Sequence, residues 1–259
     1  MLQFNLKKKE ARKELYYKKD NFISELGVEL INKKTKFVLN KPNSSILFDE
    51  RLKIKDSTGD DLIFSDIDLF LQNKKKADAF ICNFDLQIPL AINSQKFFES
   101  IYETLNVNGF FCFNILTLNS FITLQKIFLE IDDNVFSGAQ RRFGPFHDTS
   151  DIITKLNESK FKEVVVSTEQ LELNYKSLDK IRADFKELGI SNYYNERIRT
   201  NKNFYKKTIS LFKELISKHH HVPIEIEIST FTSWKYIYFN IKIFYVSKNK
   251  RFFCKSKKL

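Results

Sequence analysis

Glycine is the residue that this sequence most lacks. Six occur in 259 residues, whereas average usage of about 7% would give roughly 18. Cysteine is also scarce, and Cys82, Cys112 and Cys254 show neither metal-ligand nor redox spacing, so we expect reduced core residues. No apolar run reaches about 18 residues, and the N-terminus lacks the apolar core of a secretory signal. A cytoplasmic location is therefore expected, with peripheral membrane contact as the alternative.

What is present indicates a globular protein. The length fits one large α/β domain or two small ones, and a hydrophobic content of 42% is enough for a substantial core. The net charge is +11, but the densest basic clusters lie near the two ends, at residues 7–19 and 248–258. Such clusters are more often solvated than used for recognition. Specific nucleic-acid binding is not expected, while attraction to acidic partners or anionic lipid is reasonable.

Short apolar runs alternate with helical periodicity along the chain. The clearest unit is a strand at 79–83, a helix at 94–105, a turn at Asn106–Gly109 and a strand at 110–116, which predicts a right-handed crossover onto a parallel sheet. Further strands are predicted at 37–39, 62–64, 161–173 and 223–234, and further helices at 8–33, 149–159, 177–188 and 204–218. This order predicts an α/β fold with one doubly wound sheet, mostly parallel with an antiparallel edge strand, and a helical insertion before the last strand.

Several of these motifs resemble a known family. Asp78–Gln87 and Leu105–Phe111 resemble the fourth strand and the turn into the fifth strand of class I S-adenosylmethionine methyltransferases. Leu188–Asn192 and Val222–Tyr236 are similar to the group that contains the malonyl-carrier-protein O-methyltransferase of biotin synthesis and the mitochondrial complex I assembly factor that hydroxylates an arginine. The resemblance begins at about Lys18. It implies a Rossmann-like domain over residues 1–236 with a helical lid at about 177–217, followed by an extra strand and a basic tail at 237–259.

The family carries a glycine loop, D-L-G-C-G-x-G, after its first strand. With the first strand placed at Lys36–Asn40, the three glycine positions hold Lys41, Asn43 and Ser45, and Leu39 replaces the usual acid. Side chains here would crowd the methionine part of the cofactor, and glycine-only backbone angles would cost about 1 kcal/mol or more per residue. We therefore expect a degenerate cofactor loop, which makes S-adenosylmethionine binding doubtful.

Other cofactor-binding positions are retained in part. The resemblance implies that Asp66, followed by Ile67, contacts the adenine amine, although an ordinary solvated carboxylate is an equal alternative. Asn83 and Gln87 match polar positions of the family's pocket, but both are equally explained as capping groups at a strand end and a helix start. The carboxylate that would hold the ribose has no match unless the sheet is rebuilt around residues 49–50.

A substrate or partner site is expected around the lid. His147 matches a stretch near the family's substrate mouth, with a solvated loop histidine as the alternative. The lid contributes Tyr193, Tyr194 and Arg197, and such side chains either anchor a partner or pack the lid onto the sheet. His219–His221 do not indicate a metal, because three consecutive residues cannot all face one ion.

Two functions follow from these observations. The first is an assembly or modification factor that grips a protein partner, such as a respiratory complex subunit, with little or no catalysis. The second is an active S-adenosylmethionine-dependent methyltransferase that acts on a protein side chain or on an acyl group carried by an acyl carrier protein. No metal is expected in either case.

Overall fold

The computed structural model describes residues 4, 21–36, 42–48, 60–63, 75–187, 194, 196 and 198–236. The helices are α2 (Phe22–Thr35), α4 (Gln87–Thr104), α5 (Ile122–Phe136), α6 (Thr149–Glu158), α7 (Leu178–Glu187) and α8 (Lys202–His219). The strands are β1 (Ser44–Phe48), β2 (Asp60–Ile63), β3 (Ala77–Asn83), β4 (Leu105–Leu116), β5 (Lys162–Tyr175) and β6 (Val222–Lys235). No helix in this part of the chain is both long and apolar enough to cross a membrane.

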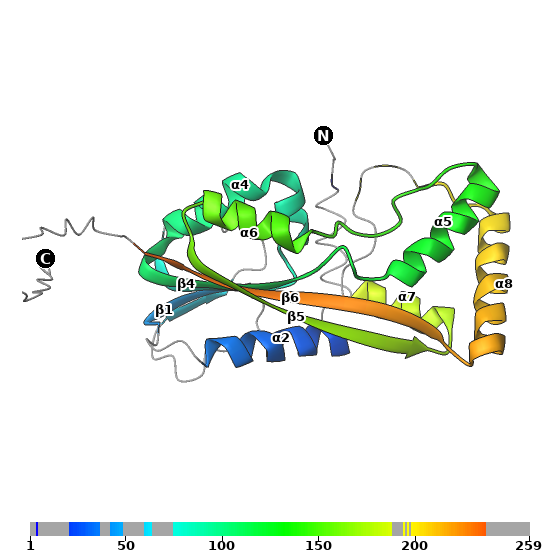
Figure 1. The fold of residues 1–259 in the computed structure, drawn as a ribbon, viewed down its shortest axis with the longest axis horizontal. Coiled ribbons are helices and arrows are strands. Elements are labelled where there is room, and N and C mark those ends of the chain that lie inside the picture. Colours follow the sequence, from blue (N-terminus) through cyan, green and yellow to red (C-terminus); the bar gives the residue numbers. More distant parts are fainter. Residues whose placement is uncertain are drawn as a thin grey trace, which may run out of the picture.

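The strands form one sheet in the order β2-β1-β3-β4-β6-β5 (Figure 1). The pairs among β2, β1, β3 and β4 are parallel, whereas β6 runs antiparallel to both β4 and β5. The predicted fold class, a mostly parallel α/β sheet with an antiparallel edge, is therefore confirmed. Because β6 reverses direction, β5 ends on the same side of the sheet as the parallel strands.

The β3-α4-β4 unit has the predicted order with shifted boundaries. Helix α4 begins at Gln87 rather than near residue 94, and Asn93 interrupts it with non-helical angles (φ −162°, ψ 87°). The predicted turn is a bulge within β4, where Asn108 has a φ of 62°. A Cβ atom at Gly109 would lie 2.7 Å from the Asn106 carbonyl oxygen, so this position needs glycine.

The predicted strand at 37–39 and Lys41 lie outside the described residues, but the predicted position of Ser45 in a glycine-type loop is wrong. Helix α2 continues to Thr35 with Lys36 as its C-cap, and the first strand is Ser44–Phe48. Ser45 is thus a strand residue with 1% exposure, and Asn43 precedes the strand. Both lie at the amino end of β1, whereas a cofactor loop must follow the carboxyl end. Residues 37–39 and 46–48 are both short apolar runs, and periodicity alone does not show which of them is the first strand of the sheet.

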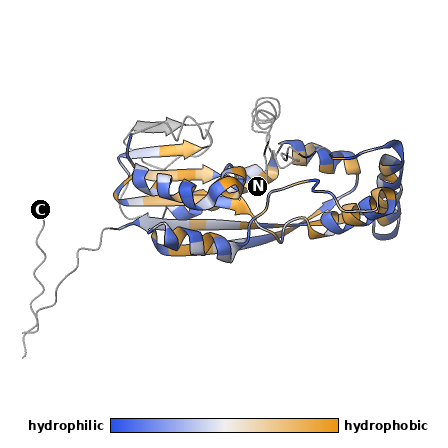
Figure 2. Ribbon diagram, turned by 90° about the horizontal axis from the view of Figure 1, so that it is seen from above, coloured by the Kyte–Doolittle hydropathy of each residue, from blue (hydrophilic) through white to orange (hydrophobic). Residues whose placement is uncertain are grey.

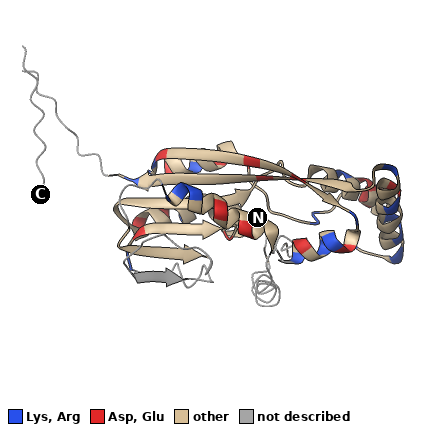
Figure 3. Cartoon of the chain, turned by 90° about the horizontal axis from the view of Figure 1, so that it is seen from below, with Lys and Arg blue, Asp and Glu red and all other residues tan. Residues whose placement is uncertain are grey.

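Aromatic side chains fill the core of the parallel strands. Phe113 stacks on Phe231 with ring centroids 4.9 Å apart, and Phe111 stacks on Phe113 at 4.6 Å. Helices α4 and α6 cover this face of the sheet, and α2 covers the other (Figure 1). Figure 2 shows hydrophobic stretches along the central strands, and Figure 3 shows many charged residues on the helices. We call β2, β1, β3 and β4 with α2, α4 and α6 the parallel half.

Strands β5 and β6 continue past the end of β4. The last residue of β4, Leu116, pairs with Ile228, but the β5–β6 ladder runs on to Tyr175 and Val222. Helices α5, α7 and α8 surround this overhang and share a second core with it. We call this overhang with its three helices the β5–β6 extension. It contains the predicted helical insertion as α7 and α8, while α5 was not predicted from the sequence.

Candidate functional site

The carboxyl ends of β1 and β3 form the topological switch point of the sheet. The connection from β1 leads outward to β2, whereas the one from β3 leads the opposite way to β4. Ligands of doubly wound sheets bind in the crevice outside such a point. The residues here are Phe48, at the end of β1, and Asn83, at the end of β3.

The Asn83 side chain holds helix α2. Its Nδ2 donates to the Ser24 carbonyl oxygen at 3.2 Å, and only 4% of the residue is exposed. Its partner in the neighbouring strand, Asn114, donates from Nδ2 to the Gly27 carbonyl oxygen at 2.9 Å. A Cβ atom on Gly27 would lie 2.3 Å from Asn83 Oδ1. The Asn83 side chain is thus engaged with helix α2, a contact that the sequence analysis did not predict.

Phe84 follows Asn83 in a left-handed conformation, with a φ of 58°. Its N–H donates to Asn114 Oδ1 at 3.0 Å, which holds the chain in this turn. A bulky residue rarely adopts such angles, and the cost is on the order of 1–3 kcal/mol. Strain therefore lies directly at the switch point. The sequence gives no signal for it, since an aromatic residue is not a typical choice for this conformation.

Gln87 and His147, sixty residues apart, are brought into contact. His147 Nε2 lies 2.7 Å from the Gln87 carbonyl oxygen, while Gln87 Nε2 donates to the Leu116 carbonyl oxygen at 3.3 Å. Burial lowers the pKa of His147, against the opposing effect of the hydrogen bond to Gln87. The neutral ring therefore donates from Nε2, which leaves Nδ1 as a proton acceptor. Gln87 is 7% exposed, and its Oε1 has no hydrogen-bond partner within the described residues.

A buried carboxylate lies next to the end of β4. Glu227 Oε1 accepts hydrogen bonds from Thr117 Oγ1 at 2.5 Å and Asn119 Nδ2 at 2.9 Å, and Oε2 accepts from Gln170 Nε2 at 2.8 Å. Burial alone would raise the pKa of Glu227, but these hydrogen bonds lower it overall. The carboxylate is ionised and fully engaged, so it holds the turn after β4. The alternation Ile224-Glu225-Ile226-Glu227-Ile228 was a visible signal of a polar face here.

The loop that carries His147 is fixed to the lid. Arg142 makes a two-pronged ion pair with Asp132 of α5, with Nε–Oδ2 2.9 Å apart, and both side chains are buried. The guanidinium carbon of Arg142 lies 3.8 Å from the centre of the Phe204 ring of α8. Tyr194 is 9% exposed beside Arg141. Tyr194, a residue of the predicted lid, thus lies against the loop that carries His147.

Other predicted site residues lie outside the described part of the chain: Lys41, Asp66, Ile67, Tyr193 and Arg197. The structure thus brings together Gln87 and His147, and Asn83 lies at the end of β3, four residues before Gln87. Asn43 and Ser45 lie at the opposite end of the sheet. Among the residues described, no group of three or more His, Cys, Asp or Glu side chains could hold a metal ion.

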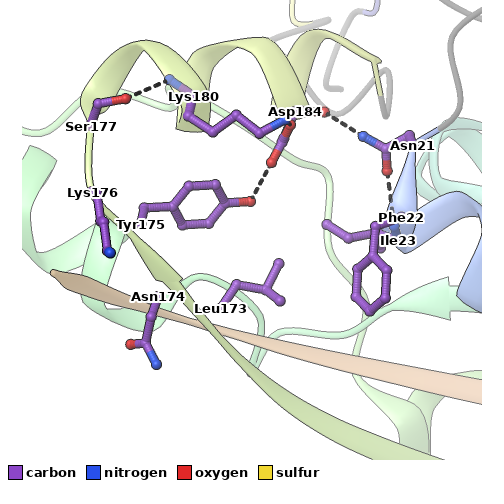
Figure 4. Close-up of a pocket in the computed structure, with 10 residues that line it drawn as sticks. All are labelled: Asn21, Phe22, Ile23, Leu173, Asn174, Tyr175, Lys176, Ser177, Lys180 and Asp184. Carbon is purple, nitrogen blue, oxygen red and sulfur yellow. Dashed lines mark hydrogen bonds and ion pairs between the residues drawn. The ribbon is translucent and has the colours of Figure 1, made fainter.

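A pocket of about 550 Å³ opens where β5 ends (Figure 4). Tyr175 donates from its hydroxyl to Asp184 at 2.8 Å, and Lys180 pairs with the same carboxylate at 2.8 Å. Burial, then the hydrogen bond to Asp184, raises the pKa of Tyr175, which stays a donor. Asn21 caps α2 on the opposite wall, and Ile23 follows it. The size suits a small organic ligand, but none of the predicted site residues lines the pocket.

Comparisons with known proteins give weak similarities. No family model matches the chain. Malonyl-[acyl-carrier protein] O-methyltransferase 1 of Coxiella burnetii is 25% identical over 95 residues, 36% of this chain and 34% of that protein. The chain thus matches about a third of the length of this curated relative.

Several solved structures are similar in outline, and some of them are described as methyltransferases. A methyltransferase of Bacillus halodurans, described as putative, has a TM-score of 0.43 and 11% identity, covering 80% of this chain and 99% of that one. The YcgJ protein of Bacillus subtilis has a TM-score of 0.46 and 9% identity, covering 82% of this chain and 99% of that one. A Haemonchus contortus phosphoethanolamine N-methyltransferase, solved with S-adenosylhomocysteine, has a TM-score of 0.41 and 14% identity. The match covers 88% of this chain and 57% of that one. Similarities of this strength do not assign an activity.

Proposed function

We propose that this chain is a methyltransferase-fold protein whose cofactor-binding half is reduced and which acts by gripping a protein partner, as an assembly or modification factor. The observation that carries the proposal is the connection between β1 and β2. Eleven residues, 49–59, join these two parallel strands. A parallel crossover usually takes a dozen or more residues and includes a helix.

The composition of this connection supports the same conclusion. The family that the sequence resembles places its glycine loop directly after the first strand, and here that position is the start of the connection 49–59. This connection contains one glycine, Gly59, next to β2, and none in the ten residues before it. The closely spaced glycines that would let a backbone approach a cofactor are therefore missing after β1.

The switch point gives further support. Asn83, the strand-end residue expected to face the cofactor, uses its amide to hold α2, and Gly27 packs against it. Additional structure lies instead in the β5–β6 extension, where Arg142 pairs with Asp132 and packs against Phe204 of the lid. A respiratory complex subunit as the partner rests on the sequence resemblance alone and stays a prediction.

An active S-adenosylmethionine-dependent methyltransferase is the second candidate. It is favoured by the 95-residue match to a malonyl-[acyl-carrier protein] O-methyltransferase. In this case the substrate would be an acyl group on a carrier protein or a protein side chain. Asp49 follows β1 directly and Asp66 follows β2 by three residues, so both carboxylates are available to a rebuilt site. His147 Nδ1 would then serve as the proton acceptor of that site.

Isothermal titration calorimetry separates the two candidates. The purified full chain is titrated with S-adenosylmethionine and, separately, with S-adenosylhomocysteine. The first candidate predicts no heat of binding at millimolar ligand, because a connection without closely spaced glycines after β1 does not cradle the cofactor. Micromolar binding of either ligand would reject it in favour of the second candidate. A chain that binds neither ligand cannot be the second candidate.

A further inference from the structure

Helix α8 presents a row of lysines on its outer side. Phe204, Thr208 and Phe212 are buried and face inward. Lys202, Lys206 and Lys213 are all exposed. Their spacing of four and seven residues places them on one face of the helix, over a length of about 16 Å. We call these three residues the lysine row.

The charge of the lysine row is not neutralised within the described part of the chain. Helix α8 contains five lysines and one acid, Glu214. Glu214 pairs with Lys218, with Nζ and Oε1 2.6 Å apart. No ion pair involves the lysine row among the residues described. Figure 3 shows this basic helix at one end of the molecule.

Exposed apolar side chains lie beside the lysine row. Tyr205 is 49% exposed and Ile209 is 48% exposed, and helical geometry places Ile209 next to the lysines. The main apolar face of α8, however, is packed against α5 and β6. A helix that lies on a bilayer uses its wide apolar face for insertion. Because that face is occupied here, the surface fits a protein better than a membrane.

We propose that the lysine row docks an acidic helix of a protein partner. Carboxylates at matching positions i, i+4 and i+11 would each meet one lysine, and a small apolar residue between them would cover Ile209. This inference rests on the proposed protein-binding function and names the chemistry of the partner. The lysine row is not among the partner residues predicted from the sequence, which were His147, Tyr193, Tyr194 and Arg197.

The test uses a synthetic helical peptide with Glu at positions i, i+4 and i+11 and Leu beside them. Binding to the full chain is measured by fluorescence anisotropy at low ionic strength. The triple variant Lys202→Glu, Lys206→Glu and Lys213→Glu should weaken binding about tenfold or more, since it replaces three attractive charge pairs with three repulsive ones. The matched control changes three exposed lysines of the parallel half, Lys76, Lys96 and Lys160, to Glu.

The outcomes are distinct. Loss of binding in the triple variant, with binding retained in the control, supports the lysine row, as does failure of a peptide with Gln in place of Glu. Equal loss in both variants shows a non-specific charge effect and overturns the inference. Vesicles of phosphatidylcholine with phosphatidylserine that bind through these lysines, when the peptide does not, would overturn it in favour of a membrane. Calorimetry with the cofactor is unaffected by these results, so the two proposals can fail separately.

Discussion

The parallel half and the β5–β6 extension both contain stacked aromatic rings but differ in their buried polar contacts. In the parallel half Phe111 stacks on Phe113, and the neutral amides of Asn83 and Asn114 hold α2. In the extension Phe128 stacks on Phe204, and the Asp132–Arg142 ion pair and the Glu227 network add buried charges. Aromatic packing tolerates many sequences, whereas buried ionic contacts demand particular partners. We therefore expect the extension to be more sensitive than the parallel half to the loss of a single polar side chain.

Breaking the ion pair of the extension should have the largest effect on stability. Asp132→Ala leaves the Arg142 guanidinium buried without its partner, so the free energy of unfolding should fall by about 3–5 kcal/mol. Asp133→Ala, one residue further along α5 and exposed, should change it by less than about 0.5 kcal/mol. Urea denaturation of both variants checks this. Similar values for the two would show that the lid is not held by the pair.

Crowding the contact between α2 and the switch point should have the next largest effect. Gly27→Ala puts a Cβ atom 2.3 Å from Asn83 Oδ1 and 2.4 Å from Phe84 Cε2, which should cost about 1–3 kcal/mol of unfolding free energy. At Gly138 an added Cβ meets nothing within 4 Å. Gly138→Ala should therefore be neutral or stabilise by up to about 1 kcal/mol. A thermal denaturation series in which both substitutions were harmless would contradict the close packing at Asn83.

The smallest effect concerns pH. Burial lowers the pKa of His147 from its ordinary value of 6.5, so the folded protein binds fewer protons than the unfolded one. The stability that comes from the neutral ring is present above the unfolded pKa and is lost as pH falls below it. Between about pH 7 and pH 5, the wild type should lose more stability than His147→Gln. If the free energy of unfolding of the wild type and of His147→Gln changed with pH in the same way, His147 would lie in open solvent instead.

The sequence predicted the middle of the fold well. Strand β3, the second part of α4 and strand β4 have strong local patterns and short connections, and α6 has Asp148 as its cap. Helix α5 was missed because it lacks a start signal: its N-cap is Phe121, with a φ of 62° and no side-chain hydrogen bond. Yet Leu124, Ile127 and Ile131 have helical spacing, so its periodicity was readable.

The candidate site was less predictable than the fold. Glu227 and Thr117 are 110 residues apart, and the contact of His147 with Gln87 also depends on tertiary structure. The placement of Ser45 in a loop was wrong because residues 37–39 and 46–48 are apolar runs with similar local signals, and it is pairing with β3 that makes Ser44–Phe48 a strand. Local patterns identify elements, but long-range packing decides which polar groups remain available for a ligand.

A crystal structure of the full chain grown with millimolar S-adenosylhomocysteine is the most direct test of the proposal that the cofactor-binding half is reduced. We expect no ligand outside the carboxyl ends of β1 and β3, with Asn83 Nδ2 still donating to the Ser24 carbonyl oxygen. A ligand seated against Asn83, with the chain after Phe48 wrapped around it, would contradict the proposal.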